Sequence, residues 1–345
     1  MSTAAPSAPT NRLGLTKQDY VGSKSTLCAG CGHDAITAQI INAAFESGIE
    51  GYQVAKFSGI GCSSKTPAYF INQGWGFNSV HGRMPAMATG ACLANRQLIN
   101  IGVSGDGDSM SIGTGQFVHA VRRNVPMIYI IEDNGVYGLT KGQFSATADK
   151  GSKAKRGAVN SDEPIDLVQL ALLLGATFVA RGFSGDKEQL VPLIKAAVEH
   201  RGAAFIDVVS PCVAFNNHPG STKSYDYVRA HNEAVNRLDF VSVRDPITAS
   251  VPAGGVQDIA LHDGGIMRLR KLHPEYDPHD NVGAVSYLEA HRMKGEVVTG
   301  LLYVEEDPTD LHVSQNTVEV PLNILSDDDL VPGNAALMEF NASLR

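Results

Sequence analysis

The chain has 345 residues, of which 43% are apolar, and its formal net charge is −8. This length and apolar content suit one large α/β domain with a substantial core, with room for an appended segment. The acidic balance argues against a nucleic-acid partner. The most apolar stretch, LVQLALLLGATFV, is too short and too interrupted to cross a bilayer.

Five cysteines do not form an even extracellular disulfide framework, so we expect a reducing compartment and a cytoplasmic protein. The first residues, MSTAAPSAPTN, have neither the basic region nor the apolar region of a signal peptide. We therefore predict a disordered tail over residues 1–12, a main domain over 13–244 and a C-terminal extension over 245–345.

A C-x-x-C pair precedes the first expected helix. Cys28 and Cys31 lie in STLCAGCGHDAITAQI, Cys62 follows in FSGIGCSSK, and Cys212 comes at the end of a later strand. Four cysteines match the ligand number of a zinc site or of an iron–sulfur cluster, and their spacing does not choose between the two. The fifth, Cys92, lies in a helix of small residues and is expected in the core.

The segment from Gly105 to Thr140 predicts a βαβ unit. The apolar run QLINIGVSGDGD is typical of a buried parallel strand that ends in glycines around Asp106, and VPMIYIIEDN of a second strand that ends at Asn134. Residues 110–123, between them, carry apolar residues at helical spacing. Both carboxyl ends then lie at the sheet edge where open α/β sheets bind ligands.

The polar groups at this edge suit a metal and a diphosphate. Asp106 and Asn134 can supply oxygen ligands to Mg²⁺, which is usually held by few protein groups and by substrate phosphates. Gly105 and Gly107 leave backbone amides free to face a diphosphate. An ordinary glycine turn in a doubly wound sheet is the alternative.

The pattern GDG with an asparagine 28 residues later resembles the motif of thiamine-diphosphate enzymes. The resemblance implies that Asp106, Asn134 and the backbone carbonyl of Val136 bind the metal. Asp133 departs from it, because many family members have asparagine there. Beside a cofactor of this kind a redox centre has a clear purpose, and Gly61 and Ser63 give the Cys62 loop groups suited to phosphate, so the iron–sulfur alternative is favoured over zinc.

In the rest of the main domain, predicted helices and strands alternate along the chain. A Gly/Ser/Lys-rich surface loop is expected over residues 145–157, helices over 165–175 and 186–200, and strands over 176–182 and 203–212. Such alternation predicts a mostly parallel, doubly wound sheet with helices on both faces. From Asp245 onward the sequence is irregular, with one strand, and suits wrapping a partner; a solvated acidic face is the alternative.

Six motifs together resemble the β subunit of 2-oxoacid:ferredoxin oxidoreductases. They are CAGCGH, GIGCSSK, HGRMPAMATG, GDGD, EDNGVYGLTKGQ and SPC, in that order, over about residues 10–240, and the resemblance is closest to the 2-oxoglutarate branch. It implies a thiamine-diphosphate-binding fold, thiamine diphosphate, Mg²⁺ and a [4Fe-4S] cluster on the four cysteines. It also implies CoA-dependent oxidative decarboxylation of 2-oxoglutarate to succinyl-CoA and CO₂, with reduction of ferredoxin.

The same resemblance suggests roles for single residues. Lys65 is a candidate partner of the substrate carboxylate, although a surface lysine is the commoner fate of this residue type. His81 is a candidate to hydrogen-bond cofactor or substrate, and Leu139 and Thr140 are candidates for the side-chain end of the substrate pocket. The expected cofactor-binding set is Ile60, Gly61, Cys62, Ser63, His81, Gly105, Asp106, Gly107, Asn134, Val136, Leu139 and Thr140.

Thiamine enzymes also need a glutamate from a second domain, and no second domain of comparable size is recognisable in this sequence. We therefore expect an α subunit to complete the active site, in an αβ or (αβ)₂ assembly without a membrane. Three alternatives stay open: a pyruvate-specific or broad-specificity enzyme, a non-oxidative thiamine enzyme with a structural Cys₄ zinc site, and a non-catalytic regulatory subunit.

Overall fold

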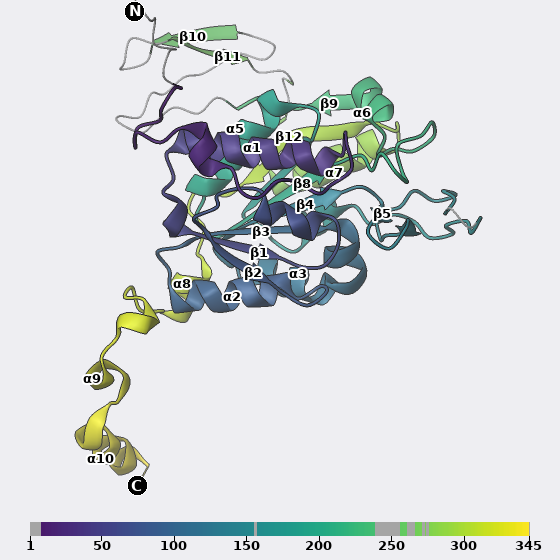
Figure 1. The fold of residues 1–345 in the computed structure, drawn as a ribbon. Helices are drawn as coiled ribbons and strands as arrows, with labels where there is room; N and C mark the ends of the chain where they lie inside the picture. The colour runs from purple at the N-terminus through teal and green to yellow at the C-terminus, as the bar shows by residue number, and fades with distance from the viewer. Residues whose placement is uncertain are drawn as a thin grey trace, which may run out of the picture.

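The computed structural model describes residues 8–154, 157–238, 256–260, 266–270, 273 and 276–344. Its centre is an eight-stranded sheet with the strand order β2-β1-β3-β4-β8-β7-β12-β9 (Figure 1). All neighbouring strands are parallel except β12 and β7, so the predicted mostly parallel sheet is confirmed. The strands are β1 Val54–Ser58, β2 Trp75–Asn78, β3 Ile99–Gly105, β4 Met127–Asp133, β7 Phe178–Phe183, β8 Ala203–Val209, β9 Asn232–Ala234 and β12 Val297–Val304.

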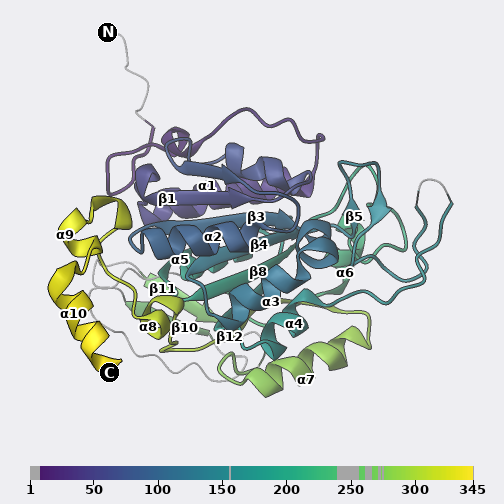
Figure 2. The same cartoon turned by 90° about the horizontal axis from the view of Figure 1, so that it is seen from below.

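Helices cover both faces of this sheet, as Figure 2 shows from below. Successive side chains of a strand point to opposite faces, so Ile128 and Ile130 of β4 join one core, and Tyr129 and Ile131 join the other. The first core is closed by α1 Gly32–Ser47 and α5 Lys187–Glu199, and the second by α2 Met84–Ala94, α3 Thr114–Arg122, α4 Leu167–Leu173 and α7 Asn281–Arg292. Cys92 lies fully buried in the second core, as expected.

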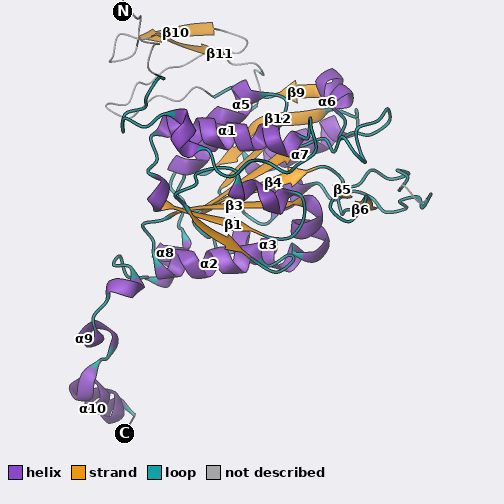
Figure 3. Cartoon of the chain, viewed as in Figure 1, coloured by secondary structure: helices purple, strands orange, loops and turns teal. Residues whose placement is uncertain are grey.

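Short elements make up the remainder (Figure 3). Two small hairpins pair β5 with β6 and β10 with β11. Among the described residues, none of the helices is both long and apolar enough to span a membrane. The short elements are β5 Val136–Tyr137, β6 Gln143–Phe144, β10 Val256–Ala260, β11 Ile266–Arg270, α6 Tyr225–His231, α8 Leu311–Gln315, α9 Asp327–Leu330, α10 Gly333–Ser343, η1 Lys17–Tyr20, η2 Gly51–Gln53, η3 Ser63–Ala68, η4 Gly107–Ile112 and η5 Leu322–Ile324.

The crossover after β3 differs from the single helix predicted over residues 110–123. It begins with one wide π turn, η4, and the α-helix starts only at Thr114. The amide of Gly113 donates to the carbonyl of Asp108 over 2.9 Å, which is the i to i+5 bond of a π turn. The side chain of Asp108 is held by neighbouring loops, so the first turn opens toward them.

Part of the chain after residue 245 packs into the main domain, and the segment beyond α8 extends away from that domain. Strand β12 lies between β7 and β9, and Leu288, Leu302 and Leu311 belong to the second core. Beyond α8 the chain extends away from the body (Figure 1). At the other end, residues 1–7 of the expected N-terminal tail lie outside the described residues, and Arg12 donates to the carbonyl of Ser47 at the end of α1.

Candidate active site

The carboxyl ends of β1, β3 and β4 surround a hollow. Every residue of the predicted cofactor-binding set lines it, together with four that were not in that set. The predicted set thus comes together in space although it spans 81 positions from Ile60 to Thr140 of the chain. The four additional lining residues are His33, Asp108, Tyr137 and Gly138.

Asp106 lies at the base of this hollow with a side chain that is almost fully buried. Its Oδ2 accepts hydrogen bonds from the Gly135 amide at 3.0 Å, from the Thr147 hydroxyl at 2.6 Å and from the Ser145 hydroxyl. Its Oδ1 has only a distant 3.5 Å contact with the Asn134 amide. Burial and the neighbouring Asp133 raise the pKa of Asp106 to about 7. A buried carboxylate that has one oxygen without a strong hydrogen bond is suited to bind a divalent cation.

His33 orients the other expected metal ligand. Its Nε2 lies 3.3 Å from Nδ2 of Asn134, and its Nδ1 lies 2.7 Å from the Ser210 hydroxyl. Burial lowers the pKa of His33 to about 4, so the ring is neutral at pH 7 and can accept from the amide at Nε2. The amide oxygen of Asn134 therefore points away from His33 and accepts from the Val136 amide at 3.0 Å.

Two glycines allow side chains that line the hollow to pack closely against the backbone. A Cβ on Gly107 would lie 2.7 Å from the Tyr137 ring, and one on Gly105 would lie 2.9 Å from the Ser63 hydroxyl. Any larger residue at these positions would collide with Tyr137 or Ser63, which themselves line the hollow. The absence of side chains therefore fits the expected diphosphate cradle.

Asp108 ties together the loops that form one wall of the hollow. Its Oδ1 accepts from the amides of Ile60 at 3.1 Å and Gly82 at 2.8 Å, and from Nδ1 of His81. Its Oδ2 accepts from the hydroxyl of Ser104. The side chain of His81 is partly exposed, so its other ring nitrogen can face a ligand.

The four predicted cluster ligands come from three separate regions of the chain. Cys28 and Cys31 precede α1, Cys62 precedes η3, and Cys212 follows β8. A Cβ on Gly138 would lie 3.4 Å from the sulfur of Cys62 and 3.8 Å from that of Cys212, so these two thiols face the same glycine. As the side chains stand, no described group of three or more His, Cys, Asp or Glu residues is arranged to hold a metal ion.

Backbone amides are directed at two of these sulfurs. The amides of Ala214, Phe215 and Asn216 favour the thiolate of Cys212, and that of His33 favours the thiolate of Cys31. Burial nevertheless raises the pKa of both thiols, that of Cys31 to about 12. A bound metal would replace these protons, and the amides would then hydrogen-bond the ligand sulfurs, as they do around iron–sulfur clusters.

Lys65 lies outside the residues that line the hollow. Its ammonium group donates to the Thr26 hydroxyl over 3.3 Å, and its charge lowers the pKa of Cys62 against the larger effect of burial. The structure therefore places Lys65 beside the cysteines, whereas His81 lies at the hollow as predicted.

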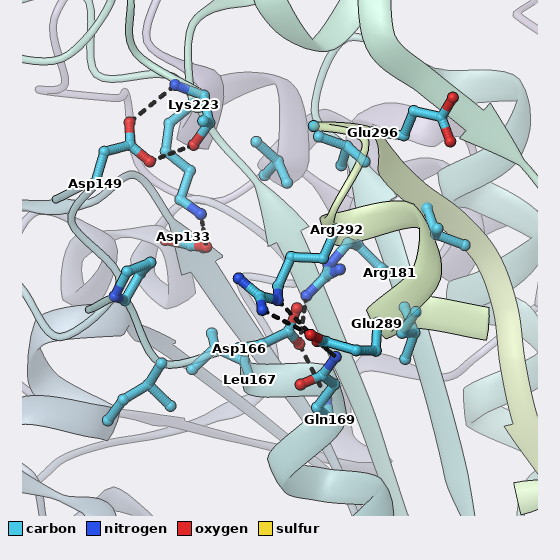
Figure 4. A pocket seen from close by; sticks show the side chains of 18 of the residues that line it. Asp133, Asp149, Asp166, Leu167, Gln169, Arg181, Lys223, Glu289, Arg292 and Glu296 are labelled. Carbon is cyan, nitrogen blue, oxygen red and sulfur yellow. Dashed lines mark hydrogen bonds and ion pairs between the residues drawn. The ribbon is translucent and has the colours of Figure 1, made fainter. Parts of the chain in front are cut away.

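A second and larger pocket adjoins the site on the far side of Asp133 (Figure 4). Lys223 reaches through it to Asp133, with 2.9 Å between Nζ and Oδ2, and Arg181 pairs with Asp166 at 2.9 Å. Burial lowers the pKa of Lys223, but Asp133 and Asp207 outweigh burial and raise it overall. Asp133, the residue that departs from the thiamine motif, therefore has its own buried cation.

Thr147 connects this ion pair to the expected metal site. Its hydroxyl oxygen lies 2.6 Å from both Asp106 Oδ2 and Asp133 Oδ1. Thr147 and Ser145 begin the segment that was predicted to be a surface loop, and both are buried. A loop of small polar residues gives no periodic signal of burial, so sequence reasoning missed this role.

Comparisons with known proteins agree with the position of the hollow. Residues 58–208 match the thiamine pyrophosphate enzyme, C-terminal TPP binding domain. A 2-oxoacid:ferredoxin oxidoreductase subunit beta from Sulfolobus is 38% identical over 273 residues, which are 76% of this chain and 87% of that protein. A 2-oxoglutarate oxidoreductase subunit KorB from Mycobacterium tuberculosis is 42% identical over 221 residues, 64% of this chain and 57% of the relative.

A solved structure is similar over nearly the whole chain. It is a 2-oxoglutarate:ferredoxin oxidoreductase from Magnetococcus marinus with 2-oxoglutarate, coenzyme A and succinyl-CoA bound. The TM-score is 0.73 at 30% sequence identity, and the match covers 94% of this chain and 96% of the other. The lining residues from Ile60 to Thr140 all lie inside the matched thiamine pyrophosphate domain.

Proposed function

Because the chain belongs to the family of 2-oxoacid:ferredoxin oxidoreductase β subunits, we propose that it is the β subunit of a thiamine-diphosphate- and [4Fe-4S]-dependent enzyme. The proposed reaction is the CoA-dependent oxidative decarboxylation of 2-oxoglutarate to succinyl-CoA and CO₂, with reduction of ferredoxin. One observation carries the proposal: Cys62 lines the cofactor hollow and faces the same glycine as Cys212, so cofactor and cluster ligands share one wall.

The choice of 2-oxoglutarate rests on relatives. Proteins named 2-oxoglutarate oxidoreductase or 2-oxoglutarate synthase subunit KorB are 37–42% identical to this chain. The Sulfolobus relative has the broader name 2-oxoacid:ferredoxin oxidoreductase. A pyruvate or broad-specificity enzyme is therefore the second candidate.

The residues of the hollow fit the cofactor and its metal. Asp106, the side-chain oxygen of Asn134 and the carbonyl of Val136 would hold Mg²⁺, and Gly105 and Gly107 would admit the diphosphate. When bound, thiamine diphosphate supplies the electron sink for decarboxylation. His33 keeps the Asn134 amide oriented, and Asp108 holds His81 at the wall where its free nitrogen can hydrogen-bond to cofactor or substrate.

The four cysteines would hold the [4Fe-4S] cluster, and the amides at Cys31 and Cys212 support this assignment. A cluster accepts and releases one electron at a time and thus matches ferredoxin. Lys65 is retained as a candidate for the substrate carboxylate, which would require its side chain to leave Thr26. Where it now lies, its positive charge favours the thiolate of Cys62.

The proposed partners are an α subunit, in an αβ or (αβ)₂ assembly, and ferredoxin. The α subunit would supply the glutamate that activates the cofactor and a large part of the coenzyme A site. The part of the C-terminal extension beyond α8 would pack on this subunit. The five cysteines are free, and four of them would serve as thiolate ligands. Because free thiols persist in a reducing compartment, they support a cytoplasmic location.

The deciding experiment is a substrate panel with the co-purified α/β complex under anaerobic conditions. CoA-dependent dye reduction should be faster with 2-oxoglutarate than with pyruvate. A preference for pyruvate would overturn the substrate assignment. No reduction with any 2-oxoacid would favour a regulatory subunit, and colourless protein with zinc but no iron or sulfide would favour a non-oxidative enzyme.

A further inference from the structure

The last part of the chain, residues 317–344, forms an arm that stands apart from the domain (Figure 1). Leu311 is the last described residue that belongs to a hydrophobic core. After it, Arg96 reaches the carbonyl of Thr317 over 3.4 Å and lies 4.0 Å from a carboxylate oxygen of the exposed Glu319, and Pro321 is the only buried residue in the described arm. The arm therefore contributes almost nothing to the stability of the domain.

The arm is nevertheless rich in large apolar side chains. Such side chains are normally buried or occur singly on a surface, and a contiguous exposed group marks an interaction site. Ten of them are between 45% and 73% exposed here: Val318, Val320, Leu322, Ile324, Leu330, Val331, Leu337, Met338, Phe340 and Leu344.

Helix α10 carries part of this group in a pattern that suits a groove. Leu337 and Phe340 of the helix and Leu344, which directly follows it, are spaced i, i+3, i+7 and form one stripe, with Met338 beside it. Amphipathic helices that bind in hydrophobic grooves use this spacing of anchors. An isolated helix of 11 residues is marginal in water, so α10 needs a surface against which to pack.

The charge of the arm limits what that surface can be. From Thr317 to the last residue, Arg345, the sequence has five acidic side chains and a single basic one, that of Arg345. Three of them, Asp327, Asp328 and Asp329, form the first turn of α9, where negative charge is favourable. The partner surface must therefore combine an apolar groove with basic residues at its rim.

We propose that the arm binds the α subunit of the same enzyme, with the stripe of α10 in an apolar groove rimmed by Lys and Arg. A second copy of this chain is a poorer occupant, because it too carries a net charge of −8 and would repel the arm at long range. The arm is as long as the roughly 20–30 residues that each side of a standard interface contributes. The inference rests on the proposed function, which requires an α subunit.

The test uses the full chain with Leu337→Asp and Phe340→Asp together. Val282→Asp on α7 is the matched control, because Val282 is 74% exposed and lies on the domain itself. Titration of labelled α subunit should show at least a roughly tenfold weaker association for the arm variant and no change for the control. Thermal melting of each isolated chain should be unchanged, since the arm lies outside the core.

Two results would overturn the inference. One is an unchanged affinity of the arm variant for the α subunit. The other is a self-association of the isolated chain, seen by sedimentation, that the arm variant abolishes, which would assign the arm to a second copy. Dye reduction by the wild-type complex tests the proposed function separately, and the arm variant should keep wild-type turnover per complex once saturated with α subunit.

Discussion

The ammonium group of Lys223 lies 2.9 Å from a carboxylate oxygen of Asp133, and their side chains are 17% and 3% exposed. This buried ion pair lies directly behind the expected metal ligand, because Asp133 precedes Asn134 and shares the hydroxyl of Thr147 with Asp106. Replacing the asparagine of the thiamine motif by aspartate introduces a negative charge, and Lys223 neutralises it locally.

Lys223→Met should therefore be strongly destabilising, whereas Lys223→Met with Asp133→Asn should recover most of the loss. Removing one partner of a buried ion pair leaves the other charge uncompensated and lowers the free energy of unfolding by about 3 kcal/mol or more. Removing both partners leaves no such charge and therefore avoids most of this loss. Urea unfolding of the four members of the double-mutant cycle measures the coupling.

The control for this cycle lies in the same pocket (Figure 4). Arg292 and Glu289 form an ion pair at 2.7 Å, but their side chains are about half exposed. Solvent screens such a pair, so Arg292→Met should change the free energy of unfolding far less than Lys223→Met does. If Lys223→Met costs no more than Arg292→Met, Lys223 does not compensate Asp133.

Asp106→Asn should abolish metal-dependent binding of thiamine diphosphate and leave the fold intact. The asparagine can keep most of the hydrogen bonds around Oδ2 but offers the metal no charge. Loss of an outer partner of a metal site already costs about 10–100-fold in affinity, so loss of the ligand itself should cost at least as much. Titration of the cofactor with Mg²⁺ or with a chelator, followed by protein fluorescence, gives the two dissociation constants.

Asp226→Asn is the matched control for this substitution, since Asp226 is exposed in the first turn of α6. It should bind the cofactor as the wild type does. Tight, metal-dependent binding by Asp106→Asn would remove Asp106 from the metal site.

Cys212→Ser should lose or degrade the cluster, whereas Cys92→Ser should not. Cys212 belongs to the proposed ligand set, and Cys92 lies in the core with its thiol directed at the carbonyl of Pro126 at 3.3 Å, which a hydroxyl can also reach. Iron and sulfide per chain, measured on anaerobically purified protein, separate the two. An unchanged iron content in Cys212→Ser would exclude this residue as a ligand.

The sequence predicted the parallel sheet and the strand ends around the hollow because both depend on local signals. Apolar runs that end in Gly105 or Asn134 identify strand ends, and strand ends in a parallel sheet meet at one edge. The role of Lys223 was not predictable in this way. It lies 90 positions after Asp133, in a loop whose composition has no period, and only the fold brings the two together.

The same reasoning explains the differences near Asp108. The apolar spacing after the GDG motif is helical, so the sequence predicts a continuous helix from residue 110. The wide turn results from the contacts of the Asp108 side chain with Ile60, His81 and Gly82, which lie 26–48 positions earlier. Tertiary hydrogen bonds of this kind override the local preference for an α-helix, and the spacing of apolar residues in the sequence does not reveal them.

Gly59→Ala tests how firmly Asp108 is held. A Cβ at residue 59 would lie 1.8 Å from Asp108 Oδ2, far inside contact distance, and the carboxylate cannot turn away without breaking its bonds to the Ile60 and Gly82 amides. We expect a loss of about 1–3 kcal/mol in the free energy of unfolding, typical of overpacking, and weaker cofactor binding because the Ile60 loop must move. In contrast, a Cβ at Gly90, within α2, meets nothing within 4 Å, so Gly90→Ala should stabilise the protein by about 0.5–1 kcal/mol.

Urea unfolding and cofactor titration check both variants. If Gly59→Ala has the same free energy of unfolding and the same affinity for the cofactor as the wild type, the Asp108 side chain is free to rearrange and does not fix the wall of the hollow.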